Sequence, residues 1–436
     1  MTMTNPLPPL SESRTLRAAT FFGLYVVEGI PSGFALTAVA NYLTYRRLDP
    51  EVIGAFAARI GIPWSVQFAW GPLIDRFQGS SMGRRKPWVL GSQFAAFLAS
   101  LGLLAVRDPA EQIAAVSVAF LIHGLFSSVQ DASVDAMAIS LIPESERGRV
   151  NAFMRAGLMV GYGAGGALWS VLIHRHGFFH AALAQSMVLL AMTVLTAFIR
   201  ERPGDSLWPR GPRAEVAPAS GTVPGIGRVF AELIRGLFDA RGLVVFGLVL
   251  LVYTGGAVFI RAYSWHLIHV LGWSDEESSV YSGTYGTAAG LATVLVGALV
   301  ADRFGLRRLM ILMMALIAGF LVIFGMMGPL WTHRSVAGSG LIIWSIFDPG
   351  FSVACMPVLM ALCRRGVEGS QFTAYMALVN LANAAGTYAS GHAQLSYPAP
   401  TIGLACGIVI AAGIPLALLT LGDDPVRVPK SAARDG

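Results

Sequence analysis

Residues 70–86 read WGPLIDRFQGSSMGRRK, and a related stretch, GALVADRFGLRR, occupies residues 297–308. Each stretch places a glycine, an aspartate and a group of arginines at the end of a long apolar run. The positions concerned are Gly71, Asp75, Arg76, Arg84 and Arg85 in the first copy, and Asp302, Arg303, Arg307 and Arg308 in the second. Because both copies follow the second apolar run of their half, the repeat predicts a chain built from two similar halves.

The composition around these stretches excludes a water-soluble domain. The chain has 436 residues, of which 55% are hydrophobic and only 13% charged, whereas about 25% of the residues of soluble domains are charged. About 20 apolar residues in a helix cross the hydrocarbon core of a bilayer. We therefore expect most of the chain to lie in lipid.

Twelve apolar runs account for this composition. They cover residues 17–44, 52–75, 86–106, 111–142, 150–173, 178–199, 242–270, 279–301, 306–328, 336–362, 372–394 and 399–421. The runs are too long and too uniformly apolar for membrane strands, which take about ten residues of alternating polarity. Glu28 interrupts the first run and no cleavage pattern precedes it, so we expect that run to be retained. The sequence predicts an all-α membrane protein with twelve transmembrane helices.

The distribution of basic residues predicts how the chain is oriented. The loops after even-numbered runs hold most of the Lys and Arg residues, and such loops stay in the cytoplasm. Both termini should therefore be cytoplasmic, in an inner membrane. This bias also explains the net charge of +6, so we expect lipid and not nucleic acid as the partner of the basic residues.

The longest connection, about 200–241, is rich in proline, glycine and arginine, a composition typical of a linker. It divides the chain into an N-terminal six-helix bundle (1–200), a cytoplasmic linker (201–240) and a C-terminal six-helix bundle with a short cytoplasmic tail (241–436). Two parallel repeats of this kind predict a central binding site between them.

Ionisable side chains inside the apolar runs mark candidate functional positions. There are four acids and three bases, namely Glu28, Arg59, Asp131, Asp135, Arg155, Arg261 and Asp348. Each costs at least about 2.5–3.5 kcal/mol at mid-membrane unless it meets a partner or water. Since acids outnumber bases, at least one carboxyl group lacks a basic partner, as a proton site requires.

Depth along the helices suggests roles for these groups. Asp135 and Arg155 lie at equal depth and are predicted to pair. Asp131, one turn deeper, and Glu28 have no base at their level, so we expect them to carry protons. The alternative is that Asp131 and Asp135 only hold helices together.

Further polar and aromatic residues in the runs are candidates for substrate contacts. Arg261 with Tyr263 and Trp265 could hold an anionic or sugar-bearing molecule by charge and stacking, although an interfacial aromatic belt explains Trp265 equally well. Arg59 is either a substrate contact or a snorkelling side chain. The remaining candidates are Tyr25, Trp64, Gln67, Gln130, Asp348, Asn380 and Asn383.

The repeated stretch resembles the signature loop of the major facilitator superfamily. Glu28-Gly29-Ile30-Pro31, Gln130-Asp131 and Gln371-Phe372 further resemble its muropeptide-permease, acetyl-CoA-transporter and siderophore-importer group. The resemblance implies the major facilitator fold, alternating access, and gating by the repeated loop.

We therefore expect proton-coupled uptake of a bulky polar metabolite such as a muropeptide, by a protein that acts as a monomer without a cofactor. A siderophore importer remains an alternative, as does an efflux antiporter or a lipid flippase on the same fold.

Other classes of protein lack support in the sequence. An enzyme would need catalytic partners beside His174, His176 and His180, and no such pattern accompanies them. Two histidines at i, i+2 do not share a helix face, so no metal site is predicted, and these histidines are expected to lie in a solvated loop. A pump driven by ATP would need a phosphate-binding loop, which the sequence does not contain.

Overall fold

The computed structural model describes residues 7–77, 80–143, 146–209, 240–362 and 368–421. Ten helical segments in these ranges are long and apolar enough to cross a membrane. The other two predicted spans, 279–301 and 372–394, also lie in unbroken helical segments, at 275–304 and 368–396. The prediction of an all-α membrane protein is confirmed.

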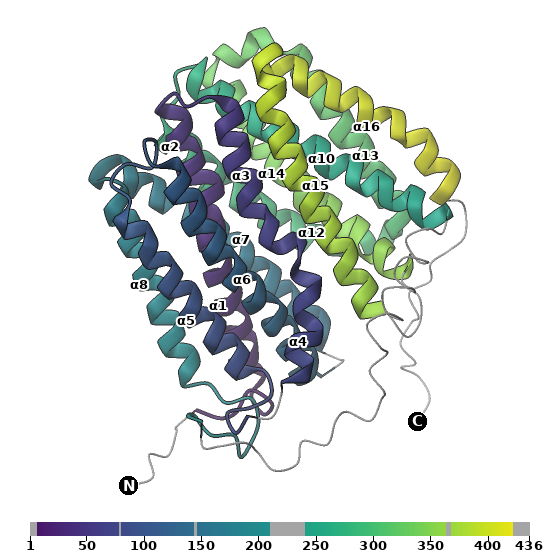
Figure 1. Ribbon diagram of the computed structural model, residues 1–436. Helices are drawn as coiled ribbons and strands as arrows, with labels where there is room; N and C mark the ends of the chain where they lie inside the picture. The colour runs from purple at the N-terminus through teal and green to yellow at the C-terminus, as the bar shows by residue number, and fades with distance from the viewer. Residues whose placement is uncertain (1–6, 78–79, 144–145, 210–239, 363–367, 422–436) are drawn as a thin grey trace.

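The N-terminal half contains six rods, which lie on the left in Figure 1. The first consists of α1 (Arg14–Gly33), the π-helical turn η1 (Phe34–Val39) and α2 (Ala40–Tyr45), and the second of α3 (Pro50–Ser65), η2 (Gln67–Ala69) and α4 (Trp70–Arg76). Then follow α5 (Lys86–Ser100) with η3 (Leu101–Ala105), α6 (Ile113–Leu141), α7 (Arg147–His176) and α8 (Phe178–Ala197).

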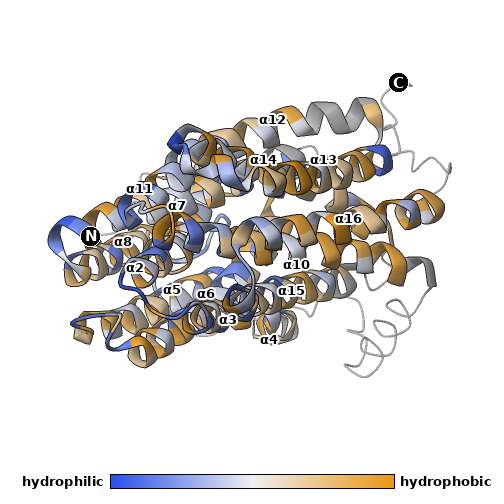
Figure 2. Cartoon of the chain, turned by 90° about the horizontal axis from the view of Figure 1, so that it is seen from above, coloured by the Kyte–Doolittle hydropathy of each residue, from blue (hydrophilic) through white to orange (hydrophobic). Residues whose placement is uncertain are grey.

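The C-terminal half repeats this order on the right of Figure 1. It contains α10 (Ala240–His269), a rod of α11 (Asp275–Val280), η5 (Tyr281–Gly286) and α12 (Thr287–Phe304), then α13 (Leu306–Met326) with η6 (Gly328–Thr332), α14 (Arg334–Leu362), α15 (Glu368–Ser396) and α16 (Ala399–Leu421). Figure 2 shows apolar residues running along the exterior helices α13 and α16, as expected for surfaces that face lipid.

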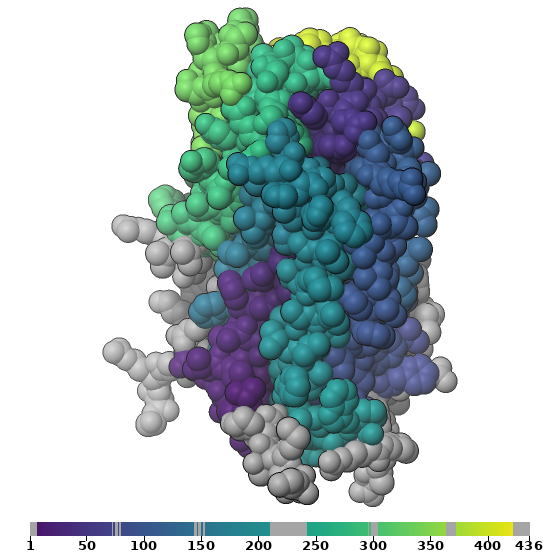
Figure 3. Space-filling view, turned by 90° about the vertical axis from the view of Figure 1, so that its left-hand side faces the viewer, coloured from purple at the N-terminus to yellow at the C-terminus, as the bar shows by residue number. Residues whose placement is uncertain are grey.

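Each half has its own packed interior. Phe259, Phe324 and Trp331 belong to the core of the C-terminal half, whereas Phe34 and Phe120 belong to that of the N-terminal half. Figure 3 shows the outer side of the N-terminal half, where α8 runs between α1 and α5. The two halves thus have separate cores.

Glycines set the distance between α1 and α7, the two helices that pack most closely in the N-terminal half. A Cβ added to Gly161 would lie 2.0 Å from the carbonyl oxygen of Val26, and one on Gly165 would lie 2.1 Å from that of Ile30. Only glycine permits backbones to approach this closely. These glycines hold Tyr25 and Glu28 of α1 beside the middle of the bundle.

We call the end where α1 begins and α16 ends the terminal face, and the other end the opposite face. The halves pack together at the opposite face, where α2 and α7 contact α11 and α2 contacts α10. Deeper in the molecule, α7 packs on η5 and α12, and α3 packs on α15. The structure is therefore closed at the opposite face.

Residues 201–209, predicted to be linker, are docked on the N-terminal half. Leu10 and Ser11 donate backbone hydrogen bonds to the carbonyl groups of Arg200 and Glu201, and Ser206 donates to that of Ser81. The rest of the predicted linker, residues 210–239, lies outside the described residues.

Candidate functional site

Three helices of the N-terminal half bring carboxyl groups together. On α6, Asp131 accepts a hydrogen bond of 2.6 Å from the Gln67 side chain of η2. One turn along, Asp135 accepts a hydrogen bond from the Tyr25 hydroxyl of α1. The Glu28 carboxyl group, also on α1, lies within hydrogen-bonding reach of the Asp131 carboxyl group. Two predicted proton carriers, Glu28 and Asp131, are therefore in direct contact.

A hydrogen bond between two carboxyl groups requires a proton on one of them, because an ionised carboxylate can only accept. Glu28 is 7% exposed, and its Oε2 is buried with no hydrogen-bond partner among the described residues. Glu28 and Asp131 thus bring two acidic side chains together between α1 and α6. We call these two residues the carboxyl pair.

The predicted ion pair between Asp135 and Arg155 is not formed. Within the described residues no salt bridge joins them, and Asp135 is instead held by Tyr25. Both Asp135 and Arg155 are solvent-exposed although they lie within long helices. Arg155 acts on Asp135 and Asp131 by longer-range electrostatics. Equal depth along α6 and α7 does not fix how each helix is rotated about its axis, and here the rotation does not bring the Arg155 guanidinium to the Asp135 carboxylate.

The C-terminal half contributes one charged residue, Asp348, to the region around Arg155. Asp348 is exposed, and Arg155 of the N-terminal half acts on it electrostatically. Beside it the buried Tyr253 hydroxyl lies 3.9 Å from Cys355 Sγ, and Tyr253 also hydrogen-bonds to Ser352. Tyr253 and Ser352 were not singled out by the sequence, because a tyrosine and a serine in an apolar helix are common packing residues.

Three aromatic and basic candidates on α10 have other roles in this structure. Arg261 donates a 2.7 Å hydrogen bond across the halves to the carbonyl oxygen of Leu36 in η1, where the wide π-helical turn leaves backbone acceptors open. Tyr263 is fully buried, and its hydroxyl donates to Ala337 O at 2.6 Å. Trp265 stacks on His269 at 4.3 Å and packs on the N-terminal core. Tyr263 is therefore a core residue and not a substrate contact, since its ring and hydroxyl are fully occupied.

The other substrate candidates fall into three groups. Trp64 packs on α6, where a Cβ added to Gly124 would lie 3.3 Å from its ring, and Gln130 is buried. Asn380 and Asn383 on α15 are partly exposed, and neither side chain forms a hydrogen bond among the described residues. Arg59 is exposed in a groove between α3 and α15.

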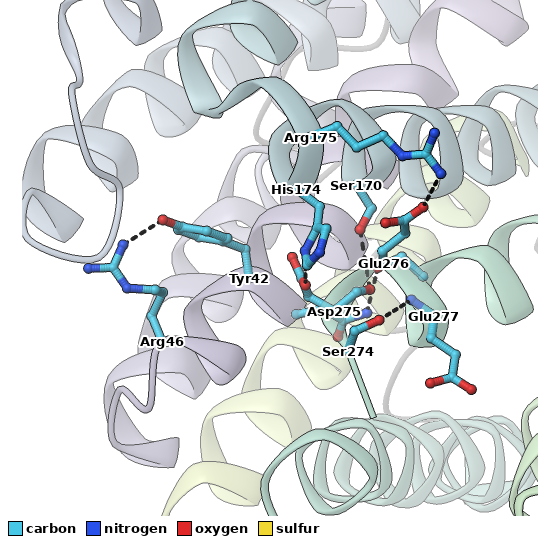
Figure 4. A network of polar contacts seen from close by, with 11 residues as sticks. Tyr42, Arg46, Ser170, His174, Arg175, Ser274, Asp275, Glu276 and Glu277 are labelled. Atoms are coloured by element: carbon cyan, nitrogen blue, oxygen red, sulfur yellow. Dashed lines mark hydrogen bonds and ion pairs between the residues drawn. The ribbon is translucent and has the colours of Figure 1, made fainter. Parts of the chain in front are cut away.

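A polar network closes the opposite face (Figure 4). His174 at the end of α7 contacts Asp275 at the start of α11, with Nδ1 3.1 Å from Oδ1. Ser170 donates to the Asp275 carbonyl oxygen at 3.2 Å, and Arg175 pairs with Glu276 at 3.3 Å. The sequence predicts a solvated loop for these histidines. That interpretation is wrong for His174, because the partner acid comes from the other half and is distant in sequence.

The signature loop is organised by a residue that sequence analysis missed. Glu201 is 2% exposed and accepts backbone N–H groups from Arg84 at 3.1 Å, from Arg85 at 2.7 Å and from Lys86. Burial raises the pKa of the Glu201 carboxyl group, and these three donors oppose that shift. Gly83, with φ of 121°, lets the loop wrap around the carboxylate, because a Cβ there would lie 2.7 Å from Glu201 Cδ.

The remaining gating candidates are placed only in part. Gly71 has open space around it, Arg307 donates to the Leu421 carbonyl oxygen at 2.8 Å, and Arg308 is exposed. The side chains of Asp75, Arg76, Asp302 and Arg303 lie outside the described residues. The predicted gating role of the repeated loop stays a prediction.

Comparisons with known proteins agree with this architecture. The family model of the Major Facilitator Superfamily matches residues 18–387 and 245–436. The anhydromuropeptide permease of Escherichia coli (strain K12) is 23% identical over 363 residues, covering 83% of this chain and 71% of the permease. An uncharacterized protein of Haemophilus influenzae is 25% identical over 331 residues, 73% of each chain.

Solved structures share the fold at low sequence identity. The nucleoside transporter NupG matches with a TM-score of 0.68 and 12% identity, over 93% of this chain and 99% of that one. The inward-open conformation of the xylose transporter XylE from E. coli matches with a TM-score of 0.69 and 14% identity, over 95% of this chain and 98% of that one.

Proposed function

Since the chain belongs to the major facilitator superfamily, and is thus a multi-pass, non-enzymatic membrane transporter, we propose that it couples the inward movement of protons to uptake of a muropeptide-like metabolite. The observation that carries the coupling is the carboxyl pair, Glu28 and Asp131. The similarity to the anhydromuropeptide permease supports the choice of substrate class.

The chemistry of the carboxyl pair favours proton carriage. Two carboxylates cannot both remain ionised in contact inside a membrane protein without a large electrostatic cost. The pair therefore keeps a proton until a conformational change exposes it to water on the other side. The side-chain amide of Gln67 donates a hydrogen bond to Asp131 and orients its carboxyl group. Because both residues belong to the N-terminal half, this orientation is kept when the halves move.

Arg155 and Asp348 supply the other charges of the central space and come from different halves. A muropeptide carries hydroxyl, amide, amine and carboxylate groups. An arginine binds carboxylates, and an aspartate accepts hydrogen bonds from hydroxyl and ammonium groups. A cargo that contacts both residues therefore connects the two halves. Such a cargo binds more tightly when the halves are close together, and this difference in affinity is what drives closure.

The positive-inside rule places the terminal face, with Arg84, Arg85 and Arg308, in the cytoplasm of an inner-membrane protein. The closed opposite face then faces the periplasm. Uptake requires this face to open, so that cargo and proton can enter from the periplasm.

Uptake of labelled anhydromuropeptide into proteoliposomes tests the proposal. We expect an inward proton gradient to accelerate uptake by the wild type. In Asp131→Asn the gradient should have no effect, whereas exchange of internal for external cargo, which needs no net proton movement, should continue. Asp49→Asn, at an exposed position before α3, is the matched control and should behave as wild type. Gradient-driven uptake by Asp131→Asn at the wild-type rate would refute the coupling role.

A further inference from the structure

A groove with a volume of about 320 Å³ runs between α3 and α15 on the outside of the molecule. Figure 1 shows these two helices side by side on the face toward the viewer. The floor of the groove is made of small residues, including Ala55 of α3 and Ala384 of α15. Toward the opposite face the helix backbones meet, since a Cβ on Gly391 would lie 2.7 Å from the Pro50 carbonyl oxygen. The groove is therefore a lateral, lipid-facing feature.

The walls of this groove are apolar apart from two side chains. Ile62 is 45% exposed and Leu381 48% exposed, as expected of residues that touch lipid chains. The polar exceptions are Arg59, which is exposed, and Tyr388, which is 45% exposed. Arg59 forms no hydrogen bond or ion pair with any described residue. An unpaired cation in an apolar, lipid-facing groove requires a partner from outside the protein.

The depth of Arg59 shows which part of the bilayer that partner comes from. Arg59 is the tenth residue of the apolar span Pro50–Ala69, about 14 Å along the helix in a hydrocarbon core about 30 Å thick. Side chains on a helix tilt toward its N-terminus, which for α3 lies at the opposite face. The guanidinium group therefore extends toward the headgroups of the leaflet at that face.

An acidic residue, Glu51, lies beyond the end of the groove nearest the opposite face, on the same side of α3 as Arg59. Glu51 lies two turns before Arg59, and its carboxylate is 49% exposed. His392 of α15 approaches it at 3.8 Å and meets the Tyr388 ring edge to face, with ring centroids 4.7 Å apart. From the membrane interior outward, the groove thus presents a cation, a tyrosine hydroxyl and then an acid with a histidine beside it.

We propose that this groove binds a phospholipid with a zwitterionic, amine-bearing headgroup. The phosphate is held by the Arg59 guanidinium with the Tyr388 hydroxyl, the primary ammonium reaches Glu51, and one acyl chain lies along Ile62 and Leu381. The order of charges in the groove matches the order of charges in the headgroup, with the phosphate nearer the hydrocarbon and the ammonium farther out. An arginine also binds phosphate through two parallel hydrogen bonds, which a lysine cannot do.

Retention of lipid in native mass spectrometry tests this site, with purified protein exposed in turn to phosphatidylethanolamine, phosphatidylcholine and phosphatidylglycerol. We expect phosphatidylethanolamine to be retained most strongly by the wild type. Arg59→Gln should lower its retention by roughly tenfold or more, the size of a lost hydrogen bond to a charged group. Glu51→Gln should remove the preference over phosphatidylcholine, whose quaternary ammonium donates no hydrogen bond.

Arg107→Gln changes an exposed arginine outside the groove and is the matched control, for which we expect wild-type retention. As a second readout, phosphatidylethanolamine should raise the melting temperature of the wild type and of Arg107→Gln but not that of Arg59→Gln. Equal retention of the three lipids by the wild type would overturn the proposal, as would unchanged retention in Arg59→Gln.

Discussion

Replacing Glu201 should open the signature loop while leaving the transmembrane helices in place. In Glu201→Ala, three backbone N–H donors, those of Arg84, Arg85 and Lys86, lose their acceptor. A hydrogen bond to a charged group contributes about 1.5–3 kcal/mol. Because the three share one carboxylate and water can reach the opened loop, their effects do not add fully. We expect a local loss of about 3–5 kcal/mol, the range seen when one partner of a buried charged contact is removed.

Hydrogen exchange of the peptide that contains Arg84, Arg85 and Lys86 measures this loss directly, since local opening governs amide protection. The expected change is a faster exchange by roughly two to three and a half orders of magnitude. Glu201→Gln, which keeps one acceptor oxygen, should lie between the wild type and Glu201→Ala. Glu111→Ala, at an exposed acid, is the control and should change little. If Glu201→Ala exchanges no faster than Glu111→Ala, the carboxylate does not hold the loop.

Two further predictions concern packing and closure. Gly161→Ala should lower the free energy of unfolding by about 1–3 kcal/mol, because the new methyl group would lie 2.0 Å from the Val26 carbonyl oxygen. Gly91→Ala, which has open space around it, should be neutral or slightly stabilising; equal melting temperatures for the two variants would contradict the packing argument. Asp275→Asn should weaken the contact with His174 and increase thiol labelling of a cysteine placed at the opposite face. Unchanged labelling would show that this contact does not hold the face closed.

The carboxyl pair and the network at the opposite face are both built between helices that are distant in sequence. Glu28 and Asp131 come from the first and fourth spans, and His174 and Asp275 from different halves. A movement of one half against the other would separate His174 from Asp275 but leave Glu28 beside Asp131, since α1 and α6 belong to one bundle. The geometry of the carboxyl pair is thus compatible with rocking of the halves.

Much of the fold was contained in the sequence. Long apolar runs predict helices because a lipid-exposed backbone must satisfy its own hydrogen bonds, and the repeated loop at 70–86 and 297–308 predicts two halves. The presence of Glu28 and Asp131 in apolar runs was enough to single them out, because charged groups in lipid require a special environment. All of these signals are local along the chain.

Only the tertiary structure decided how each helix is rotated about its axis. In a membrane the lipid-facing and the protein-facing sides of a helix are both apolar, so hydropathy does not distinguish them. This is why Tyr263 was expected at a substrate site and lies in the core. It is also why the sequence left Arg59 as either a substrate contact or a snorkelling side chain, whereas in the structure Arg59 lies in a lateral groove. The same limit explains why Asp135 was paired with Arg155, since depth along the helices does not show that the side chain of Asp135 meets the Tyr25 hydroxyl of α1.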